Sequence, residues 1–208
     1  MKKIILFFLL AISVFSSSKN IETGKGEGEK MNPFNKKIVK INHDDREIYG
    51  VAYLPQIEGN YPIVIFSHGF NGTNKDFAMY GQYLAERGIG VYEFDFCGGS
   101  VNSKSSLKTE EMTIFTEVED LSGVIEEIRA WEKVDKNNIF LFGGSQGGLV
   151  TALVAEKYQE EIEGILLLFP AFCIAEDWTK KFLKYEDIPE KIDLWGVTLG
   201  REFFQTIY

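Results

Sequence analysis

The sequence predicts an α/β fold, in which a mostly parallel sheet carries helices on both of its faces. Short apolar runs rich in β-branched residues occur at 62–67, 89–96, 138–142 and 164–169. Stretches with helical spacing of apolar residues separate these runs. Strands that are apolar throughout are buried on both faces, and strands joined through helices run parallel. The 208 residues, of which 45% are hydrophobic, are enough for one domain with a sizeable core.

A hairpin is expected before the first of these strands. Residues 37–42 and 47–54 both have the composition of strands, and the charged residues 43–46 between them fit a turn. After the strand that follows, a helix is expected over 76–87. Gly88 is a suitable C-terminal cap for this helix.

The longest helix is expected after a polar loop at 98–108. Apolar residues beyond this loop recur at intervals of three and four, which marks one face of an amphipathic helix: Ile114, Val118, Leu121, Ile125, Ile128 and Trp131. A further helix is expected over 149–158, between the last two strands.

The first 35 residues are expected to lie outside the fold. Two lysines, an apolar run of about a dozen residues and three serines form the pattern of a secretory signal peptide over 1–18. The run is shorter than the ~20 apolar residues of a membrane span. We therefore expect a secreted or extracytoplasmic protein, attached to a membrane only if this segment is retained as an anchor. Residues 19–35, rich in Gly, Glu and Lys, have the composition of a flexible linker.

Charge and composition exclude several classes of function. A formal net charge of −9 opposes the binding of nucleic acid. The chain has only two histidines, His43 and His68, and two cysteines, Cys97 and Cys173. This set is too small and too scattered for a zinc or iron–sulfur site, so neither a metal nor a cofactor is expected. For the cysteines, two free thiols and a disulfide are both open.

The segment 142–148 fits the pattern G-x-S-x-G between a buried strand and a helix. A strand that turns directly into a helix holds the central residue, Ser145, in a strained backbone conformation. A Cβ atom at Gly143 or Gly147 would obstruct the close approach of the two elements. The helix N-terminus and the N–H of Gln146 point at the space beside the serine hydroxyl. Ser145 is therefore a candidate nucleophile, and a purely structural glycine-rich turn is the alternative.

A second motif, Ser-His-Gly-Phe-Asn-Gly at 67–72, follows an earlier strand. Acyl transfer at a serine requires two N–H donors for the developing oxyanion, one after the nucleophile and one from an earlier strand–helix loop. The N–H of Phe70, next to Gly69, is the candidate for the second donor. His68 is either a structural loop residue or the catalytic base, and the usual triad order of Ser, acid, His favours the structural role. His43 is expected to be solvated in the hairpin turn.

Together these motifs resemble the α/β-hydrolase superfamily over residues 36–208. Within it, the chain is similar to the feruloyl/cinnamoyl esterase-like branch, also called serine aminopeptidase-like hydrolases. The stretches that carry the resemblance are FSHGFNGTNKDF (66–77), YEFDFCGGS (92–100), MTIFTEVEDL (112–121), LFGGSQGG (141–148) and LLLFPA (166–171). The resemblance implies an α/β-hydrolase fold with Ser145 as nucleophile and the N–H groups of Phe70 and Gln146 as oxyanion hole. The supporting turn positions are Gly143, Gly147, His68 and Gly69.

The resemblance also divides the chain into a core at 36–171 and a lid-like segment at 172–208. Many relatives carry Gly-x-Gly where this sequence has Cys-Gly-Gly-Ser at 97–100, which leaves the shape of that loop open. Aromatic residues of the lid either line a pocket for an aromatic acyl group or belong to the core: Trp178, Phe182, Tyr185, Trp195, Phe203 and Phe204.

The catalytic set is incomplete in this sequence. Family members place the acid and the histidine after the nucleophile and beyond the lid, yet no histidine follows Ser145. The candidate acids downstream of Ser145 all fall within the lid: Glu176, Asp177, Asp187 and Asp193. Loss of the base costs ~10⁴–10⁶-fold in rate. We expect a hydrolase truncated before its final strands and inactive as printed. Non-catalytic use of the fold, or a base from a partner chain or an unusual residue, is the alternative.

The expected activity of the family-level protein is hydrolysis of a carboxylic ester through an acyl-enzyme on Ser145. Aromatic acyl esters are the favoured substrates, and a small ester is the expected partner. A serine peptidase or amidase of the same fold is one alternative. A non-catalytic hydrolase-fold protein that binds acyl compounds is the other.

Overall fold

The computed structural model describes residues 31–207. The signal-peptide expectation for 1–18, and most of the linker expected at 19–35, lie outside the described residues. Among those residues, no helix has both the length and the apolar character needed to cross a membrane.

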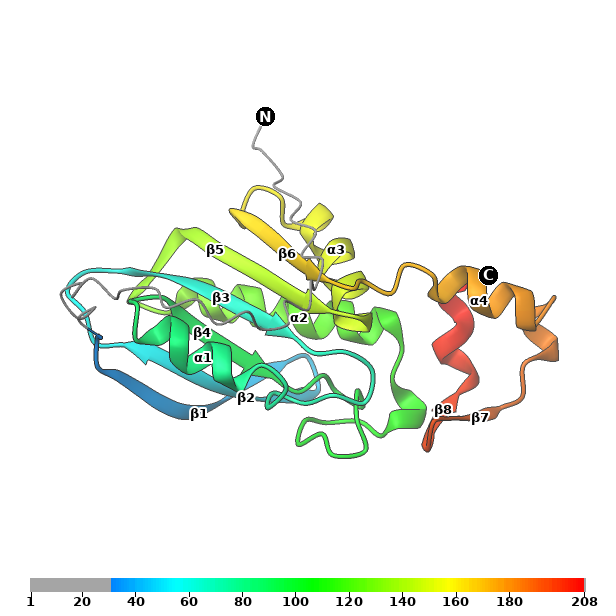
Figure 1. The fold of residues 1–208 in the computed structure, drawn as a ribbon. Helices are drawn as coiled ribbons and strands as arrows, with labels where there is room; N and C mark the ends of the chain where they lie inside the picture. Colours follow the sequence, from blue (N-terminus) through cyan, green and yellow to red (C-terminus); the bar gives the residue numbers. More distant parts are fainter. Residues whose placement is uncertain (1–30, 208) are drawn as a thin grey trace, which may run out of the picture.

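Six strands form the main sheet, in the order β1-β2-β4-β3-β5-β6 (Figure 1). Their bounds are Phe34–His43 (β1), Arg46–Pro55 (β2), Tyr61–Ser67 (β3), Gly90–Phe94 (β4), Val134–Gly144 (β5) and Gly164–Leu168 (β6). β1 and β2 form the expected antiparallel hairpin, and β2 is also antiparallel to β4. The remaining neighbours, β4-β3-β5-β6, run parallel. The predicted sheet is confirmed, with β5 starting four residues earlier than expected.

Three helices cover the two faces of this sheet (Figure 1). They are α1 (Ala78–Ala85), α2 (Ile114–Ala130) and α3 (Gln146–Lys157). α1 packs on β2 and β4 and closes a small apolar cluster that includes Tyr53, Phe66 and Ala85. α2 and α3 enclose the larger core on the opposite face. Burial of these two apolar layers supplies the main driving force for folding, and it fixes the strand ends at which the site is built.

The hairpin turn differs from expectation at His43. Asp44 adopts a positive φ of 51°, a conformation that Asp tolerates in tight turns. His43 is only half-exposed, because its ring packs on helix α2 at Gly123, where an added Cβ would come within 2.3 Å of His43 Cγ. The expectation of a solvated His43 is wrong, since the long hairpin reaches back over α2.

Residues after β6 form a separate layer beyond the ends of the parallel strands, which we call the lid (Figure 1). Its elements are α4 (Ile174–Lys181), the 3-10 helix η2 (Tyr185–Asp187), the antiparallel hairpin of β7 (Lys191–Leu194) and β8 (Val197–Gly200), and the 3-10 helix η3 (Arg201–Ile207). Trp195 and Gly196 form the hairpin tip, both with positive φ. The Thr109 hydroxyl, in the 3-10 helix η1 (Thr109–Glu111), anchors the hairpin by donating to Thr198 O at 2.7 Å.

Candidate active site

The site is built where β5 ends and α3 begins. Ser145, the single residue between them, has φ 52° and ψ −119°. A positive φ is rare for a residue with a side chain and marks stored backbone strain. The turn leaves Ser145 exposed between buried neighbours. The backbone conformation expected for a nucleophile elbow is therefore present, and it presents the hydroxyl to solvent.

Two glycines permit the close approach of β5 and α3. A Cβ at Gly143 would lie 2.4 Å from both Gly147 O and Thr151 Oγ1. A Cβ at Gly147 would lie 2.2 Å from His68 O. Such distances are well inside van der Waals contact, so both positions require glycine, as the sequence motif indicated.

The loop after β3 lies directly against the elbow. A Cβ at Gly69 would come within 3.1 Å of Ser145 Cβ, which places the Gly69–Phe70 peptide beside the serine. Among the described residues, neither the Phe70 N–H nor the Gln146 N–H donates to a protein acceptor. The Gln146 N–H also belongs to the first turn of α3, where the helix dipole is positive. The structure thus brings together the three groups named from the sequence, since Phe70, Ser145 and Gln146 line one cavity.

His68 has a structural environment. Its ring is buried, and Nε2 accepts a hydrogen bond from the Phe96 N–H at 3.0 Å. Nδ1 therefore carries the proton, and it donates to Gly69 O at 2.7 Å. Burial lowers the pKa of His68. With both ring nitrogens engaged by the backbone, His68 has no free lone pair for Ser145, and the reading of His68 as catalytic base is wrong.

A buried carboxyl group that sequence reasoning missed lies beneath the site. Glu117 of α2 is 1% exposed and accepts a hydrogen bond from Gln146 Nε2 at 2.9 Å. Burial is the main cause that raises the pKa of Glu117 to about 8. Its position was visible in the sequence, because Glu117 falls three residues after Ile114 and four before Leu121, on the apolar face of the predicted helix.

The loop at 97–100, whose shape the sequence left open, is held by hydrogen bonds at both ends. The Cys97 N–H donates to Asp120 Oδ2 at 2.7 Å, and Asp120 also forms an ion pair with Arg46 at 3.0 Å. Burial raises the pKa of Asp120 to about 6, against the opposing effect of Arg46. At the other end, the Ser100 hydroxyl donates to Asn71 Oδ1 at 3.1 Å. The loop therefore ties the oxyanion loop to α2.

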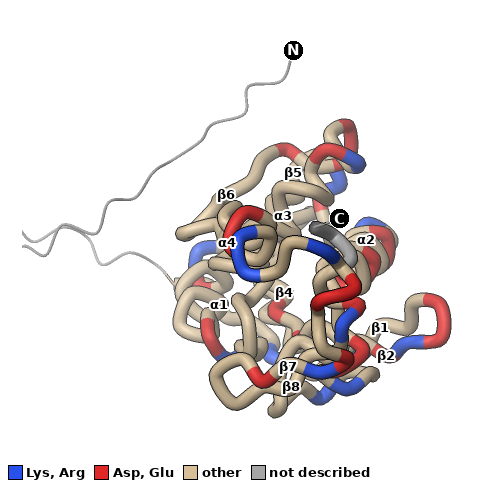
Figure 2. Tube along the Cα trace, turned by 90° about the vertical axis from the view of Figure 1, so that its right-hand side faces the viewer, with Lys and Arg blue, Asp and Glu red and all other residues tan. Residues whose placement is uncertain are grey.

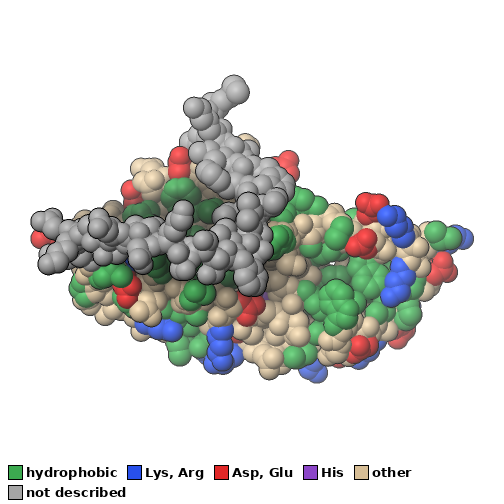
Figure 3. Space-filling view, in the orientation of Figure 1, with side chains coloured by type: hydrophobic (Ala, Val, Ile, Leu, Met, Phe, Trp, Pro, Cys, Tyr) green, Lys and Arg blue, Asp and Glu red, His purple; other side chains and the backbone are tan. Residues whose placement is uncertain are grey.

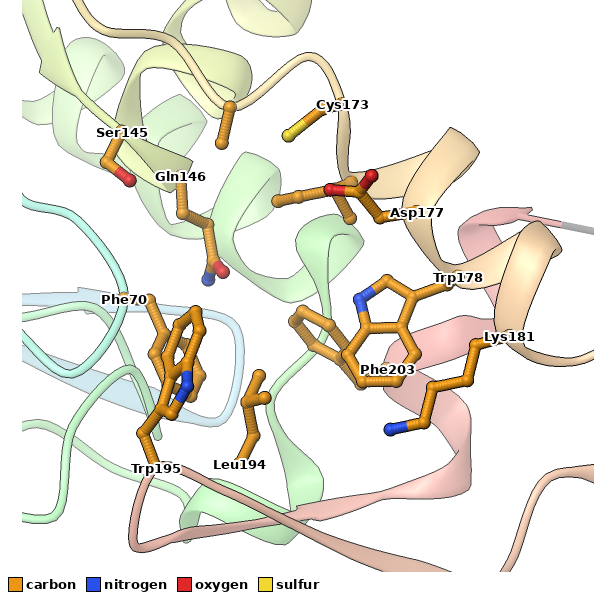
Figure 4. Close-up of a pocket in the computed structure, with 12 residues that line it drawn as sticks. Phe70, Ser145, Gln146, Cys173, Asp177, Trp178, Lys181, Leu194, Trp195 and Phe203 are labelled. Carbon is orange, nitrogen blue, oxygen red and sulfur yellow. The ribbon is translucent and has the colours of Figure 1, made fainter.

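A cavity of about 430 Å³ extends from Ser145 into the lid (Figure 4). Phe70 and Gln146 line it on the side of the core, while Trp178, Trp195 and Phe203 line it on the side of the lid. Hydrophobic side chains are also prominent at this end of the molecule in the space-filling view (Figure 3). A cavity of this size and composition suits a small, mostly apolar ligand.

The six lid aromatics divide between cavity and core. Trp178, Trp195 and Phe203 line the cavity, and Trp195 also meets the Phe70 ring edge to face at 6.0 Å. Five of the six belong to the apolar core or pack against it, so that two of the cavity residues do both: Trp178, Phe182, Tyr185, Phe203 and Phe204. Both readings of this cluster hold, each for part of it.

The acidic residues of the lid do not complete a catalytic set within the described residues. Asp177 lines the cavity, Glu176 pairs with Lys180, and Asp193 Oδ1 accepts from the Gly196 N–H in the hairpin turn. Asp187 lies in η2 and is exposed. None of the four contacts a histidine in residues 31–207, where His43 and His68 are both used elsewhere.

Both cysteines are free thiols. Cys97 is buried, whereas Cys173 is exposed and lines the cavity. Burial raises the pKa of Cys97, and the neighbouring Asp177 carboxylate raises that of Cys173. The disulfide alternative is not adopted, and neither thiol is activated as a thiolate.

The chain is similar to several known proteins. Residues 60–192 match the protein family described as serine aminopeptidase, S33. Among curated proteins, protein phosphatase methylesterase 1 of Candida albicans is 29% identical over 107 residues, covering 51% of this chain and 28% of that protein. A proline iminopeptidase of Thermoplasma volcanium is 33% identical over 102 residues, covering 48% of this chain and 32% of that protein. These matches span about a third of the length of those relatives.

The fold is also that of solved structures. Est1E from Butyrivibrio proteoclasticus with bound ferulic acid superposes with a TM-score of 0.73 and 25% identity, covering 81% of this chain and 70% of that one.

Proposed function

Since the chain belongs to the serine aminopeptidase S33 family and is a hydrolase with the α/β-hydrolase fold, we propose that it acts on carboxylic esters with an aromatic acyl group. One observation carries this proposal: Ser145, at a strained elbow, opens onto a cavity lined by aromatic residues, and the N–H groups of Phe70 and Gln146 beside it donate to no acceptor in residues 31–207. The family supports the proposed reaction class, and the aromatic lining of the cavity supports the proposed substrate class.

The proposed reaction has two steps. Ser145 Oγ attacks the carbonyl carbon of the ester while a general base takes its proton, and the oxyanion is held by the N–H groups of Phe70 and Gln146. Collapse of the tetrahedral intermediate breaks the bond to the alcohol, which leaves with that proton. Water then attacks the acyl-enzyme, restores the serine and releases the acid.

The general base is the group that the described residues do not provide. Ser145 Oγ has no hydrogen-bond partner in residues 31–207, and both histidines there are engaged elsewhere. We propose that the base comes from outside these residues. By itself, the printed chain would then retain only what the oxyanion donors and binding contribute, roughly 10³–10⁴-fold over water.

Two observations support an aromatic acyl group in the substrate. Trp178, Trp195 and Phe203 offer ring faces and edges for stacking with a planar acyl group. Est1E, whose structure contains ferulic acid, has the same fold at 25% identity. Among curated relatives, a methylesterase also cleaves an ester, whereas proline iminopeptidases favour the alternative of an amide substrate.

A second candidate function follows from the absence of a general base among residues 31–207. A cavity without a general base can still bind a ligand. The geometry of the described residues therefore fits a non-catalytic protein that binds aromatic acyl compounds equally well. The two functions differ in the reactivity of Ser145 and not in the shape of the cavity.

A serine-directed fluorophosphonate separates these functions. We expect covalent labelling of the folded protein, measured as a mass increase by intact mass spectrometry, and loss of labelling in Ser145→Ala. Ser122→Ala is the matched control, since Ser122 is a buried serine of α2. Labelling that persists in Ser145→Ala, or folded protein that takes up no probe, would contradict the proposed hydrolase.

The substrate class needs a separate assay. Protein isolated from its natural source is tested with methyl ferulate, methyl butyrate and an alanine anilide at equal concentration. We expect the highest kcat/KM for methyl ferulate. A preference for the anilide would instead support the peptidase or amidase alternative.

A further inference from the structure

The end of the cavity away from Ser145 carries a positive charge. Of the residues that line the cavity, Lys181 is the only cation and Asp177 the only carboxylate. Figure 4 shows them on opposite sides of the Trp178 ring, with the Asp177 carboxylate near Cys173 and the Lys181 amine directed toward the space beside Phe203. The cavity is thus apolar along its length and charged at its lid end.

Lys181 has no carboxylate partner within ion-pair distance in residues 31–207. Its neighbour Lys180 does, since it pairs with Glu176 one turn earlier on the exposed side of α4. Asp177 and Lys181 are four residues apart, a spacing that allows a helical ion pair, yet they do not form one. Lys181 is instead held against two rings, with Nζ 4.7 Å from the centre of Trp178 and 5.5 Å from that of Phe182.

Helix α4 is arranged to keep this cation available. Its acidic residues, Glu176 and Asp177, lie in the first turn and its lysines in the last, as the view toward the lid shows (Figure 2). This distribution complements the helix dipole. The Lys181 ammonium therefore sits at the negative end of the helix, beside aromatic faces that attract it.

We propose that Lys181 forms an anion subsite, so that the protein prefers ligands with an apolar body and an anionic group, such as a carboxylate, at the end distant from the ester. The inference rests on the proposed function only for the orientation of the ester toward Ser145. The subsite commits the ligand to one direction, because an anionic group at the other side of Trp178 would meet Asp177. Neutral aromatic esters fill the same cavity without this contact.

Equilibrium binding tests the subsite without chemistry. In the Ser145→Ala variant, binding of 4-(methoxycarbonyl)benzoate and of its neutral analogue 4-(methoxycarbonyl)benzamide is followed by quenching of tryptophan fluorescence, since Trp178 and Trp195 line the cavity. An ion pair open to water is worth up to about fivefold in an equilibrium constant, and we expect a Kd ratio of that order in favour of the carboxylate. Raised salt should reduce the ratio.

Variants assign the preference to Lys181. We expect Lys181→Met to remove it and Lys181→Arg to retain it. Lys180→Met, which changes an equally charged residue of the same exposed helix, should leave it unchanged. A carboxylate preference that survives Lys181→Met, or no preference in the starting protein, would overturn the proposal.

The outcome is separable from that of the proposed function. If fluorophosphonate fails to label Ser145 while the Lys181-dependent preference is found, the hydrolase proposal fails and the subsite stands. If Ser145 is labelled and the two ligands bind equally, the subsite fails and the hydrolase proposal stands.

Discussion

At the scale of single residues, the site depends on side chains whose roles are set by burial. His68 shows this most clearly, because both of its ring nitrogens are committed to backbone groups. Burial lowers the pKa of His68, so its ring stays neutral at pH values where an ordinary histidine is already protonated. It therefore couples the loops after β3 and β4 without taking part in proton transfer.

We predict that His68 keeps the neutral Nδ1–H tautomer as the pH falls below the ordinary histidine pKa of 6.5, because burial lowers its pKa. Long-range ¹H–¹⁵N correlation spectra across a pH titration would show this directly. Because the folded-state pKa is lowered, the stability contributed by neutral His68 is lost as the pH falls. A titration of His68 with a pKa above 6.5 would contradict the assignment.

Glu117 gives the opposite pH dependence. Burial raises its pKa from an ordinary 4.5 to about 8 in the folded protein, so the native state binds more protons than the unfolded state between these values. Stability should therefore fall as the pH rises from about 4.5 to about 8, by an amount on the order of a few kcal/mol. Gln146 and Asp120 are the neighbours that modify this shift.

The test compares Glu117→Gln with Glu119→Gln, an exposed glutamate of the same helix. We expect Glu117→Gln to flatten the fall in unfolding free energy between pH 6 and pH 9 in urea titrations, and Glu119→Gln to leave it unchanged. Equal slopes in both variants would show that Glu117 does not titrate in this range. Glu93 is also buried, and its pKa is raised to about 8, so it accounts for the fall in unfolding free energy that remains in the Glu117→Gln variant.

At the scale of elements, the elbow at Ser145 requires β5 and α3 to pack closely, whatever its role in catalysis. We predict that Gly147→Ala lowers the free energy of unfolding by several kcal/mol, because the new Cβ would lie 2.2 Å from His68 O, a backbone atom that cannot move alone. Gly164→Ala in β6 is the control, since its Cβ would meet only ordinary contacts at 3.4 Å and beyond. Thermal or urea unfolding measures both, and similar losses would contradict the constraint.

At the scale of the whole molecule, much of the architecture could be predicted from the sequence, and the reasons are local. Apolar runs marked β3 to β6, and the three- and four-residue spacing marked α2 almost to the residue. α3 begins at Gln146, three residues before the expected start. The glycines of this first turn have low helix propensity, so the sequence did not indicate a helix there. They are nevertheless required, because α3 packs closely against β3 at this point.

The features that could not be predicted depend on contacts between distant segments. The lid hairpin has two four-residue strands, too short for a clear alternation, and it is fixed by Thr109 about ninety residues away. Likewise Glu117 meets Gln146 only once α2 packs on α3. In the sequence, the serine motif stood out, but the partners beneath it did not.

The open side of the sheet leads to a prediction for the molecule as a whole. Within the described residues β6 pairs only with β5. Its side chains are not fully covered, since Leu166 is 42% exposed, and Phe169, directly after the strand, is 70% exposed. An apolar edge strand with free N–H and C=O groups is a template for pairing with another copy. We expect the printed chain to self-associate with rising concentration in sedimentation velocity. Leu166→Lys should reduce this association, whereas Met79→Lys, at a 75% exposed position on α1, should not. If both variants associate as the starting chain does, the contact lies elsewhere than at the β6 edge.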